Sequence, residues 1–277
     1  MSKLLHKRFL KASIICLFFC SLTLKSDFKS RIKLGCGTYG LVFTNPNSPL
    51  ECTKFIPKAN TLDISEEIAI HQKVYQIIKN SRDPYLAVPK FVRTSSNKKF
   101  HKIEMERIFS YNGESQLLHL SWNYPSQFSS KDNQGRYLGI QSFEKKYKGT
   151  PSVEIIAKKL GAFYGLLHNN EIDAYDMEFV LGKSSSSTQS WKIYGLDFDK
   201  SQIIPKASPQ KIERKIAERN YETIEGRTRI FARSLSYFPI IKELYEIFSR
   251  SYLETRRGQI KEAKEIIAYH KKFISFE

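Results

Sequence analysis

The feature that most constrains this chain is a cluster of three glycines between Leu34 and Val42. Gly35, Gly37 and Gly40 stand at the spacing G-x-G-x-x-G, and Val42 completes the longer form G-x-G-x-x-G-x-V. Glycines at this spacing leave backbone N–H groups uncovered, so a phosphate can approach the main chain closely. The same spacing occurs in ordinary hairpin turns. The flanking sequence must therefore decide between a plain turn and a phosphate-binding loop.

The residues after the last glycine favour a pair of strands. A dinucleotide-binding fingerprint would open into a helix at this point. Here a short apolar segment is followed by a turn rich in Asn and Pro at 45–49 and by a second apolar segment at 51–56. We therefore predict three short strands within 31–56, with the glycines in the hairpin between the first two.

A lysine in the second apolar segment is the next candidate. Lys54 lies inside a predicted strand, where its ammonium needs a partner because an unpaired buried charge is costly. The periodicity of residues 63–78 predicts an amphipathic helix with Glu66 and Glu67 in its first turns. Either glutamate can face the strand of Lys54, and Glu67 is preferred; the alternative is an exposed acid favoured by the helix dipole. Further strands at 88–92 and 102–108 bring this part to five strands and one helix.

The second half combines a long helix with a loop rich in acids. A helix is predicted to begin at 150–152, with Pro151 in its first turn, and to end at His168. An acidic loop with Asp176 and Glu178 follows, then an apolar strand at 179–181 and a strand at 191–199 that contains Asp197. A short strand is predicted at 136–140. Beyond residue 209 the chain is expected to be helical, with breaks near Gly226, Pro239 and Gly258.

Taken together, the glycine loop, strand lysine, helix glutamate, loop aspartate and Leu-Asp-Phe-Asp at 196–199 resemble the ordered motifs of protein kinases. The resemblance implies an α+β, protein-kinase-like two-lobed fold, with a five-stranded antiparallel N-lobe sheet plus one helix and a reduced, mainly helical C-lobe. It divides the chain into an N-terminal extension at 1–30, a nucleotide-binding lobe at 31–108 and a second lobe at 109–277.

The kinase resemblance also assigns roles. Lys54 would contact the phosphates, Glu67 would orient it, Asp176 would be the catalytic base, and Asp197 with Glu178 would hold Mg²⁺. The nucleotide, expected to be ATP, would be bound by residues of the glycine loop, by the lysine and by the segment that connects the lobes: Gly35, Gly37, Gly40, Val42, Lys54, Met105, Glu106 and Ile108.

A narrower resemblance covers residues 31 to 255. The segments at 105–108, 137–139, 167–168, 172–182 and 196–199, with Tyr237-Phe-Pro239 and Phe248-x-x-x-Tyr252-Leu, resemble an uncharacterised fungal family. Its members carry a domain of unknown function and are sometimes labelled zinc-finger-protein-like. The family implies a protein-kinase-like fold and brings no established activity. Because this sequence has no Cys/His cluster of ligand spacing, we expect no structural zinc.

Three departures from the kinase pattern leave the activity open. Ala174 stands where a histidine is expected, Asp176 and Glu178 are two residues apart rather than five, and Asp199 replaces a glycine. We therefore expect a pseudokinase or divergent kinase that binds ATP and Mg²⁺ in the interlobe cleft. The alternatives are an active small ATP-dependent phosphotransferase, or a basic nucleic-acid or membrane-binding module without a nucleotide site.

Charge bears on the partners. The chain of 277 residues carries a net charge of +17, which favours phosphate-bearing partners, although a solvated basic surface explains it equally. A protein partner or phosphoacceptor is expected but unidentified, and nucleic acid has no motif in its support.

The N-terminal segment leaves the compartment open. An apolar run at 12–24 follows several basic residues and resembles a signal peptide, with the secretory pathway implied. If this run instead packs on the domain, the protein is cytoplasmic or nuclear. Among the four cysteines, a Cys36–Cys52 bridge is conceivable only in an oxidising compartment, and free thiols are preferred.

Overall fold

A computed structural model describes residues 30–36, 40–59, 64–110, 118–120, 151–175, 177–184, 191–204, 224–235 and 242–272. The described elements form a mixed α+β structure that divides into two compact units. The first unit comprises Met1–Thr61 and Val92–Arg107, and the second comprises Leu62–Phe91 and Ile108–Glu277. The apolar run at 12–24, the strand expected at 136–140 and the break expected at Pro239 lie outside the described residues.

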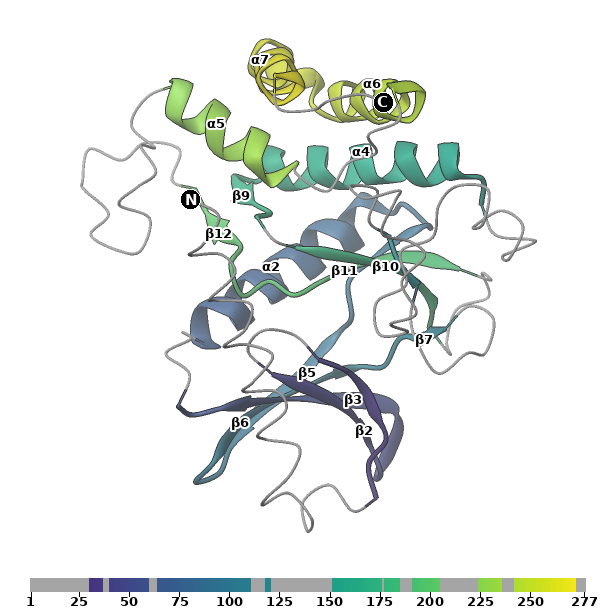
Figure 1. Cartoon of the computed structure of the whole chain (residues 1–277), viewed down its shortest axis with the longest axis vertical. Helices are drawn as coiled ribbons and strands as arrows, with labels where there is room; N and C mark the ends of the chain where they lie inside the picture. Colours follow the sequence, from purple (N-terminus) through teal and green to yellow (C-terminus); the bar gives the residue numbers. More distant parts are fainter. Residues whose placement is uncertain are drawn as a thin grey trace, which may run out of the picture. The chain divides into compact units, whose positions relative to one another are not determined.

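The first unit is built on a five-stranded antiparallel sheet, as the sequence predicts. Its strand order is β1-β2-β3-β6-β5 (Figure 1). The strands are β1 (Lys33–Cys36), β2 (Leu41–Asn45), β3 (Ser48–Pro57), β5 (Phe91–Ser96) and β6 (Phe100–Glu106). A small apolar cluster of Phe43, Phe55 and Phe100 packs on this sheet, with edge-to-face ring contacts along it.

The expected strand at 88–92 is displaced in the structure. Residues 86–87 form the short strand β4, and β5 begins only at Phe91. Pro89 has no N–H to contribute to a ladder, and its carbonyl oxygen accepts a hydrogen bond of 2.7 Å from Nε2 of His71. The backbone around Pro89 is therefore bonded to a helix side chain rather than to a neighbouring strand.

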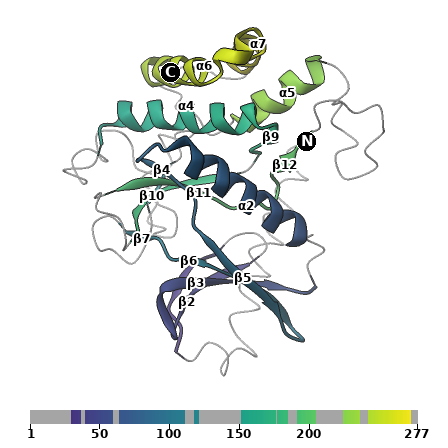
Figure 2. The same cartoon turned by 180° about the vertical axis from the view of Figure 1, so that it is seen from behind.

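The second unit contains the described helices. They are α2 (Ile64–Ser81), α4 (Val153–Asn169), α5 (Ile224–Ser234), α6 (Lys242–Thr255) and α7 (Ile260–Lys271), with a short 3₁₀ turn at Arg257–Gln259. Its strands are β4 (Leu86–Ala87), β7 (Phe109–Ser110), β8 (Leu118–His119), β9 (Ile172–Asp173), β10 (Glu178–Lys183), β11 (Lys192–Leu196) and β12 (Gln202–Ile203). Seen from behind, α4 lies between the β10–β11 sheet and the layer of α6 and α7 (Figure 2).

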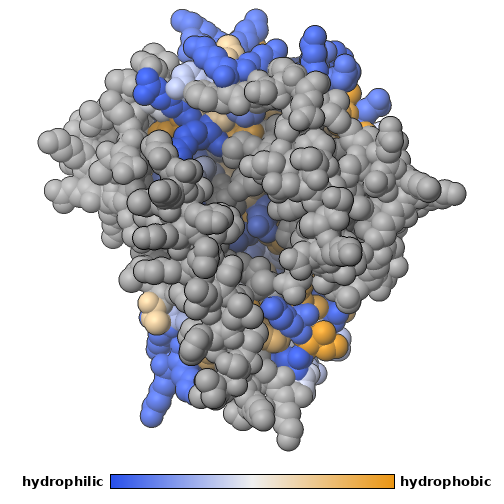
Figure 3. Space-filling view, viewed as in Figure 1, coloured by the Kyte–Doolittle hydropathy of each residue, from blue (hydrophilic) through white to orange (hydrophobic). Residues whose placement is uncertain are grey.

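Helix α4 is the centre of the second unit. Its face of Ile156, Leu160, Phe163, Tyr164 and Leu167 is buried in a continuous apolar core that includes residues of α2, β10, β11 and the C-terminal helices. In the space-filling view, the described residues over α5, α6 and α7 are mostly hydrophilic (Figure 3). No helix among the described residues is long and apolar enough to cross a bilayer.

Two expected helix boundaries are wrong. Pro151 is not in the first turn of α4: Ser152 is the N-cap, and its Oγ accepts a hydrogen bond of 3.4 Å from the N–H of Ile155. Gly226 does not break a helix but lies buried inside α5. The expected break near Gly258 is confirmed, because the 3₁₀ turn separates α6 from α7 there.

Candidate functional site

In the first unit the lysine and the glycine-bearing strands are neighbours. Strand β3 lies between β2 and β6, and Lys54 pairs with Val42 on one side and with Ile103 on the other. Its side chain is buried. Met105 pairs with Cys52, and Glu106 with Glu51, so the end of β6 follows β3 in register.

The glycines differ in what surrounds them. A Cβ at Gly40 would lie 2.7 Å from the carbonyl oxygen of Phe55, so the close approach of β2 to β3 requires a glycine there. A Cβ at Gly35 would meet nothing within 4 Å, although Gly35 lies in β1 next to an irregularity in the β1–β2 register. Gly37 lies outside the described residues. Packing therefore explains the glycine at position 40 but not the one at position 35.

In the second unit the β10–β11 hairpin brings two acids to one end. Glu178 pairs with Leu196, the residue directly before Asp197. The side chain of Glu178 is exposed and that of Asp197 is half-buried. Asp197 has a φ of 58°, in the left-handed region that non-glycine residues seldom adopt. Such conformations cluster at functional sites, where the surrounding structure maintains them.

The segment before this hairpin is only partly described. Strand β9 pairs with β12, and the buried carboxylate of Asp173 accepts a hydrogen bond of 3.1 Å from the N–H of Tyr175. Ala174, at the position expected for a histidine, is fully buried. Asp176, the expected base, lies outside the described residues.

Helix α2 contributes a buried acid and a buried histidine to the second unit. Glu67 is buried whereas Glu66 is exposed. One turn further along, the ring of His71 lies 5.0 Å from that of Phe198, centroid to centroid. No local sequence pattern predicts this contact. It connects α2 to the residue that follows Asp197.

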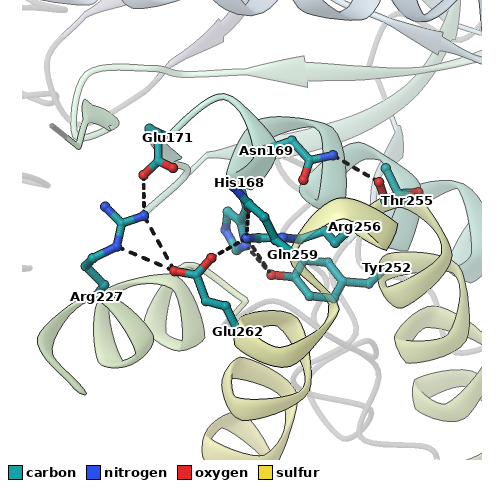
Figure 4. Close-up of polar contacts among 9 residues, drawn as sticks. All are labelled: His168, Asn169, Glu171, Arg227, Tyr252, Thr255, Arg256, Gln259 and Glu262. Atoms are coloured by element: carbon teal, nitrogen blue, oxygen red, sulfur yellow. Dashed lines mark hydrogen bonds and ion pairs between the residues drawn. The ribbon is translucent and has the colours of Figure 1, made fainter. Parts of the chain in front are cut away.

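A polar network joins α5 and α7 to Glu171, the residue before β9 (Figure 4). Arg227 of α5 pairs with Glu171 at 2.5 Å and with Glu262 of α7 at 3.4 Å, and Glu262 pairs with Arg256 at 2.5 Å. Glu171 directly precedes β9. The network therefore joins the C-terminal helices to the chain segment that leads to Asp176.

Both ring nitrogens of the buried His168 lie within hydrogen-bond distance of a hydroxyl group. Nδ1 is 2.7 Å from the hydroxyl oxygen of Tyr252, and Nε2 is 2.8 Å from that of Ser234. Burial, with the nearby charge of Arg256, holds the pKa of His168 well below its ordinary value.

Within the described part of the chain, no group of three or more His, Cys, Asp or Glu side chains is arranged to hold a metal ion. Carboxylate oxygens are nevertheless ligands that suit Mg²⁺, which binds one or two carboxylates and completes its shell with waters and phosphate oxygens. Comparisons with protein-family models and with curated proteins found no match to this chain.

Proposed function

We propose that this chain is a protein-kinase-like protein, a pseudokinase or divergent kinase, that binds ATP together with Mg²⁺. The observation that carries the proposal is the β10–β11 hairpin, whose register sets Glu178 beside the residue that precedes Asp197. Two hard oxygen donors at one hairpin end suit a magnesium ion that is also bound to a nucleotide. The metal would supply charge neutralisation on the phosphates.

The first unit supports the phosphate end of the proposal. Lys54 stands on the strand next to β2, in direct register with Val42, so its ammonium belongs to the same small region of sheet as the glycine loop. Gly35 has open space where a side chain would stand. Gly35 pairs with Val42 from the other side of β2, so one strand separates it from Lys54. Phosphate-binding loops combine an uncovered backbone with a lysine.

The remaining roles follow from these. Lys54 binds the phosphates, and Asp197 with Glu178 holds the metal. The pseudokinase reading is preferred over the active phosphotransferase because the loop between Asp176 and Glu178 is short and because Ala174 replaces a polar anchor with a buried methyl group.

Ligand-induced stabilisation tests the proposal. At 100 times its dissociation constant, a nucleotide that binds only the folded protein adds about 2.7 kcal/mol of stability. For a chain of this size that corresponds to a rise in melting temperature of roughly 5–10 °C. Mg²⁺–ATP should give this rise with wild-type protein and with the control Glu254→Gln, an exposed carboxylate on α6. Asp197→Asn and Glu178→Gln should reduce it.

The same preparation separates enzyme from pseudokinase. ATP turnover that disappears in Asp176→Asn and in Asp197→Asn would establish the active phosphotransferase. Stabilisation by ATP without turnover would establish the pseudokinase. No stabilisation by ATP with either Mg²⁺ or Mn²⁺ would contradict both.

A further inference from the structure

Glu171 has an unusual backbone conformation at the point where the chain leaves α4 and enters β9. Its φ is 57°, in the left-handed region that a glutamate seldom adopts, and its side chain is buried. Asp197, the proposed metal ligand, has a φ of 58°. Such conformations persist only where surrounding contacts maintain them. The contacts of Glu171 therefore identify the residues that maintain this part of the chain.

Glu171 is bonded through both its side chain and its backbone. Its carboxylate accepts a hydrogen bond of 2.5 Å from the guanidinium of Arg227, which also pairs with Glu262 of α7 (Figure 4). Its carbonyl oxygen accepts a hydrogen bond of 2.6 Å from the N–H of Ile204. Arg227 is therefore connected, through this one glutamate, to the residue that directly follows β12.

The segment bonded to Glu171 is the one that carries Asp197. Strand β12 ends directly before Ile204 and pairs with β9, the strand that directly follows Glu171. Between Asp197 and β12, the N–H of Ser201 donates to the carbonyl oxygen of Phe198 at 3.1 Å and closes a turn. The contacts of Glu171 therefore fix one end of a short segment, residues 197–204, whose other end is Asp197.

Arg227 supplies the charge that keeps the carboxylate of Glu171 inside the protein. A buried carboxylate without a cation is costly, so the loss of Arg227 would drive this side chain toward water. Because the carbonyl oxygen of Glu171 is bonded to Ile204, a shift of the glutamate backbone would be passed to β12 and to the turn that follows Asp197.

We propose that Arg227 is a positioning residue for the metal site: through Glu171 it holds residues 197–204 in the conformation in which Asp197 binds the nucleotide-bound Mg²⁺. The inference rests on the proposed function, which makes Asp197 a metal ligand. In this arrangement Arg227 does not itself contact the metal or the nucleotide. Replacing residues that hold metal ligands in place typically lowers metal affinity about 10–100-fold.

Titration calorimetry with Mg²⁺ and a non-hydrolysable ATP analogue tests the inference. Arg227→Met, which keeps much of the side-chain length but loses the charge, should weaken binding about tenfold. Arg227→Lys, which keeps a cation within reach of Glu171, should recover part of the loss. Glu171→Gln is a milder second variant, because it leaves Arg227 paired with Glu262, and it should give a smaller loss.

A matched control separates positioning from general destabilisation. Lys159→Met removes another partly buried ion pair of the same unit, that of Lys159 with Asp83 at 2.6 Å, and should leave the nucleotide affinity unchanged. Hydrogen exchange of the ligand-free protein provides the second readout. Amides of residues 197–204 should exchange faster in Arg227→Met than in wild-type protein, and at the wild-type rate in Lys159→Met.

Unchanged nucleotide affinity in Arg227→Met, an equal loss in Lys159→Met, or unchanged exchange of residues 197–204 in Arg227→Met would each overturn the inference. If wild-type protein binds the analogue and Arg227→Met binds it equally well, the inference alone fails. If wild-type protein does not bind the analogue while Arg227→Met accelerates exchange of residues 197–204, the nucleotide proposal fails and Arg227 stands as the residue that positions this segment.

Discussion

Two glycines of α4 occupy positions where the neighbouring helix leaves no room for a side chain. A Cβ at Gly161 would collide with the carbonyl oxygen of Phe248 in α6, and one at Gly165 would lie 2.7 Å from Cβ of Thr255. Gly161 and Gly165 are four residues apart, so they form one groove along α4. Close contact between the two helices depends on this groove.

Replacing Gly161 with alanine should therefore destabilise the second unit. The gain in helix propensity is about 1 kcal/mol, and overpacking against backbone costs more, so we expect a net loss of about 1–3 kcal/mol. The free energy of unfolding in urea measures it. Gly258→Ala is the matched control, because nothing lies within 4 Å of a Cβ there. Equal stability of both variants would contradict the close packing of α4 on α6.

The thiol of Cys52 should be inert in the folded protein. Cys52 is buried and free, and its Sγ donates to the carbonyl oxygen of Glu106 at 3.7 Å. Burial raises the pKa of this thiol to about 12, so the thiolate is scarce at neutral and mildly alkaline pH. Peptide mapping after alkylation at pH 8 should find Cys52 unmodified in native protein and modified in denaturant. Rapid native alkylation would contradict the burial of β3.

Charged residues at conspicuous positions can be predicted from the sequence, whereas contacts between distant elements cannot. Lys54 is predicted because a charge within an apolar segment is conspicuous, and Glu67 because its segment resembles a kinase helix; both side chains are buried. The pairing of Arg227 with Glu171 was missed because 56 residues separate them and each resembles an ordinary surface residue. His71 and His168 were assigned no role, yet both are buried and bonded. Contacts between distant elements leave no local pattern.

At the scale of elements, the apolar segments of the sequence predict four strands of the first sheet in place and the helices α2 and α4, whereas the expected strand at 88–92 is displaced to β5. The predicted ends of helices and strands are less accurate where a hydrogen bond of a side chain determines them, as at the N-cap Ser152 and at Pro89, whose carbonyl is bonded to His71. The left-handed backbone conformation of Asp197 could not be predicted from the sequence either, because aspartate is compatible with several conformations. The order of motifs could be recognised along the chain, but the surroundings of each motif could not.

The ion pair of Arg256 with Glu262 should contribute strongly to the free energy of unfolding, because it connects the C-terminal helices. Arg256 is fully buried and pairs with Glu262, Gln259 and Tyr252. Glu262→Ala removes the anionic partner of a buried cation, which typically costs about 3–5 kcal/mol. Replacing both members with apolar residues, as in Arg256→Met with Glu262→Leu, should cost less than Glu262→Ala alone.

Chemical denaturation of the two variants measures this difference. The exposed pair of Arg93 and Glu104 in the first unit provides the comparison: Glu104→Ala should cost about 1 kcal/mol or less. If Glu262→Ala lowers the free energy of unfolding as little as Glu104→Ala does, the ion pair of the buried Arg256 does not stabilise the fold as expected.

At the scale of the whole molecule, stability should fall on acidification. Burial lowers the pKa of His270 to about 4, and His168 is lowered by burial and by Arg256. Between the ordinary histidine value of about 6.5 and about 4, the unfolded chain binds protons that the folded chain does not. Each histidine therefore removes about 1.4 kcal/mol per pH unit as the pH falls through this window.

Unfolding free energies measured from pH 7 to pH 5 test this dependence, with the fluorescence of the buried Trp191 as one probe. His270→Asn should reduce the slope below pH 6.5. Constant stability across this range would show that the two histidines are not buried in neutral form.

The proposal that this chain binds ATP with Mg²⁺ assigns the phosphates to Lys54 and the metal to Asp197. Titration calorimetry with Mg²⁺ and a non-hydrolysable ATP analogue tests it most directly, on wild-type protein, Lys54→Ala, Asp197→Asn and the double variant. We predict that each single change weakens binding at least about tenfold, as expected for charge-assisted contacts. Wild-type binding that neither substitution alters, or the absence of binding by the wild-type protein, would contradict the claim.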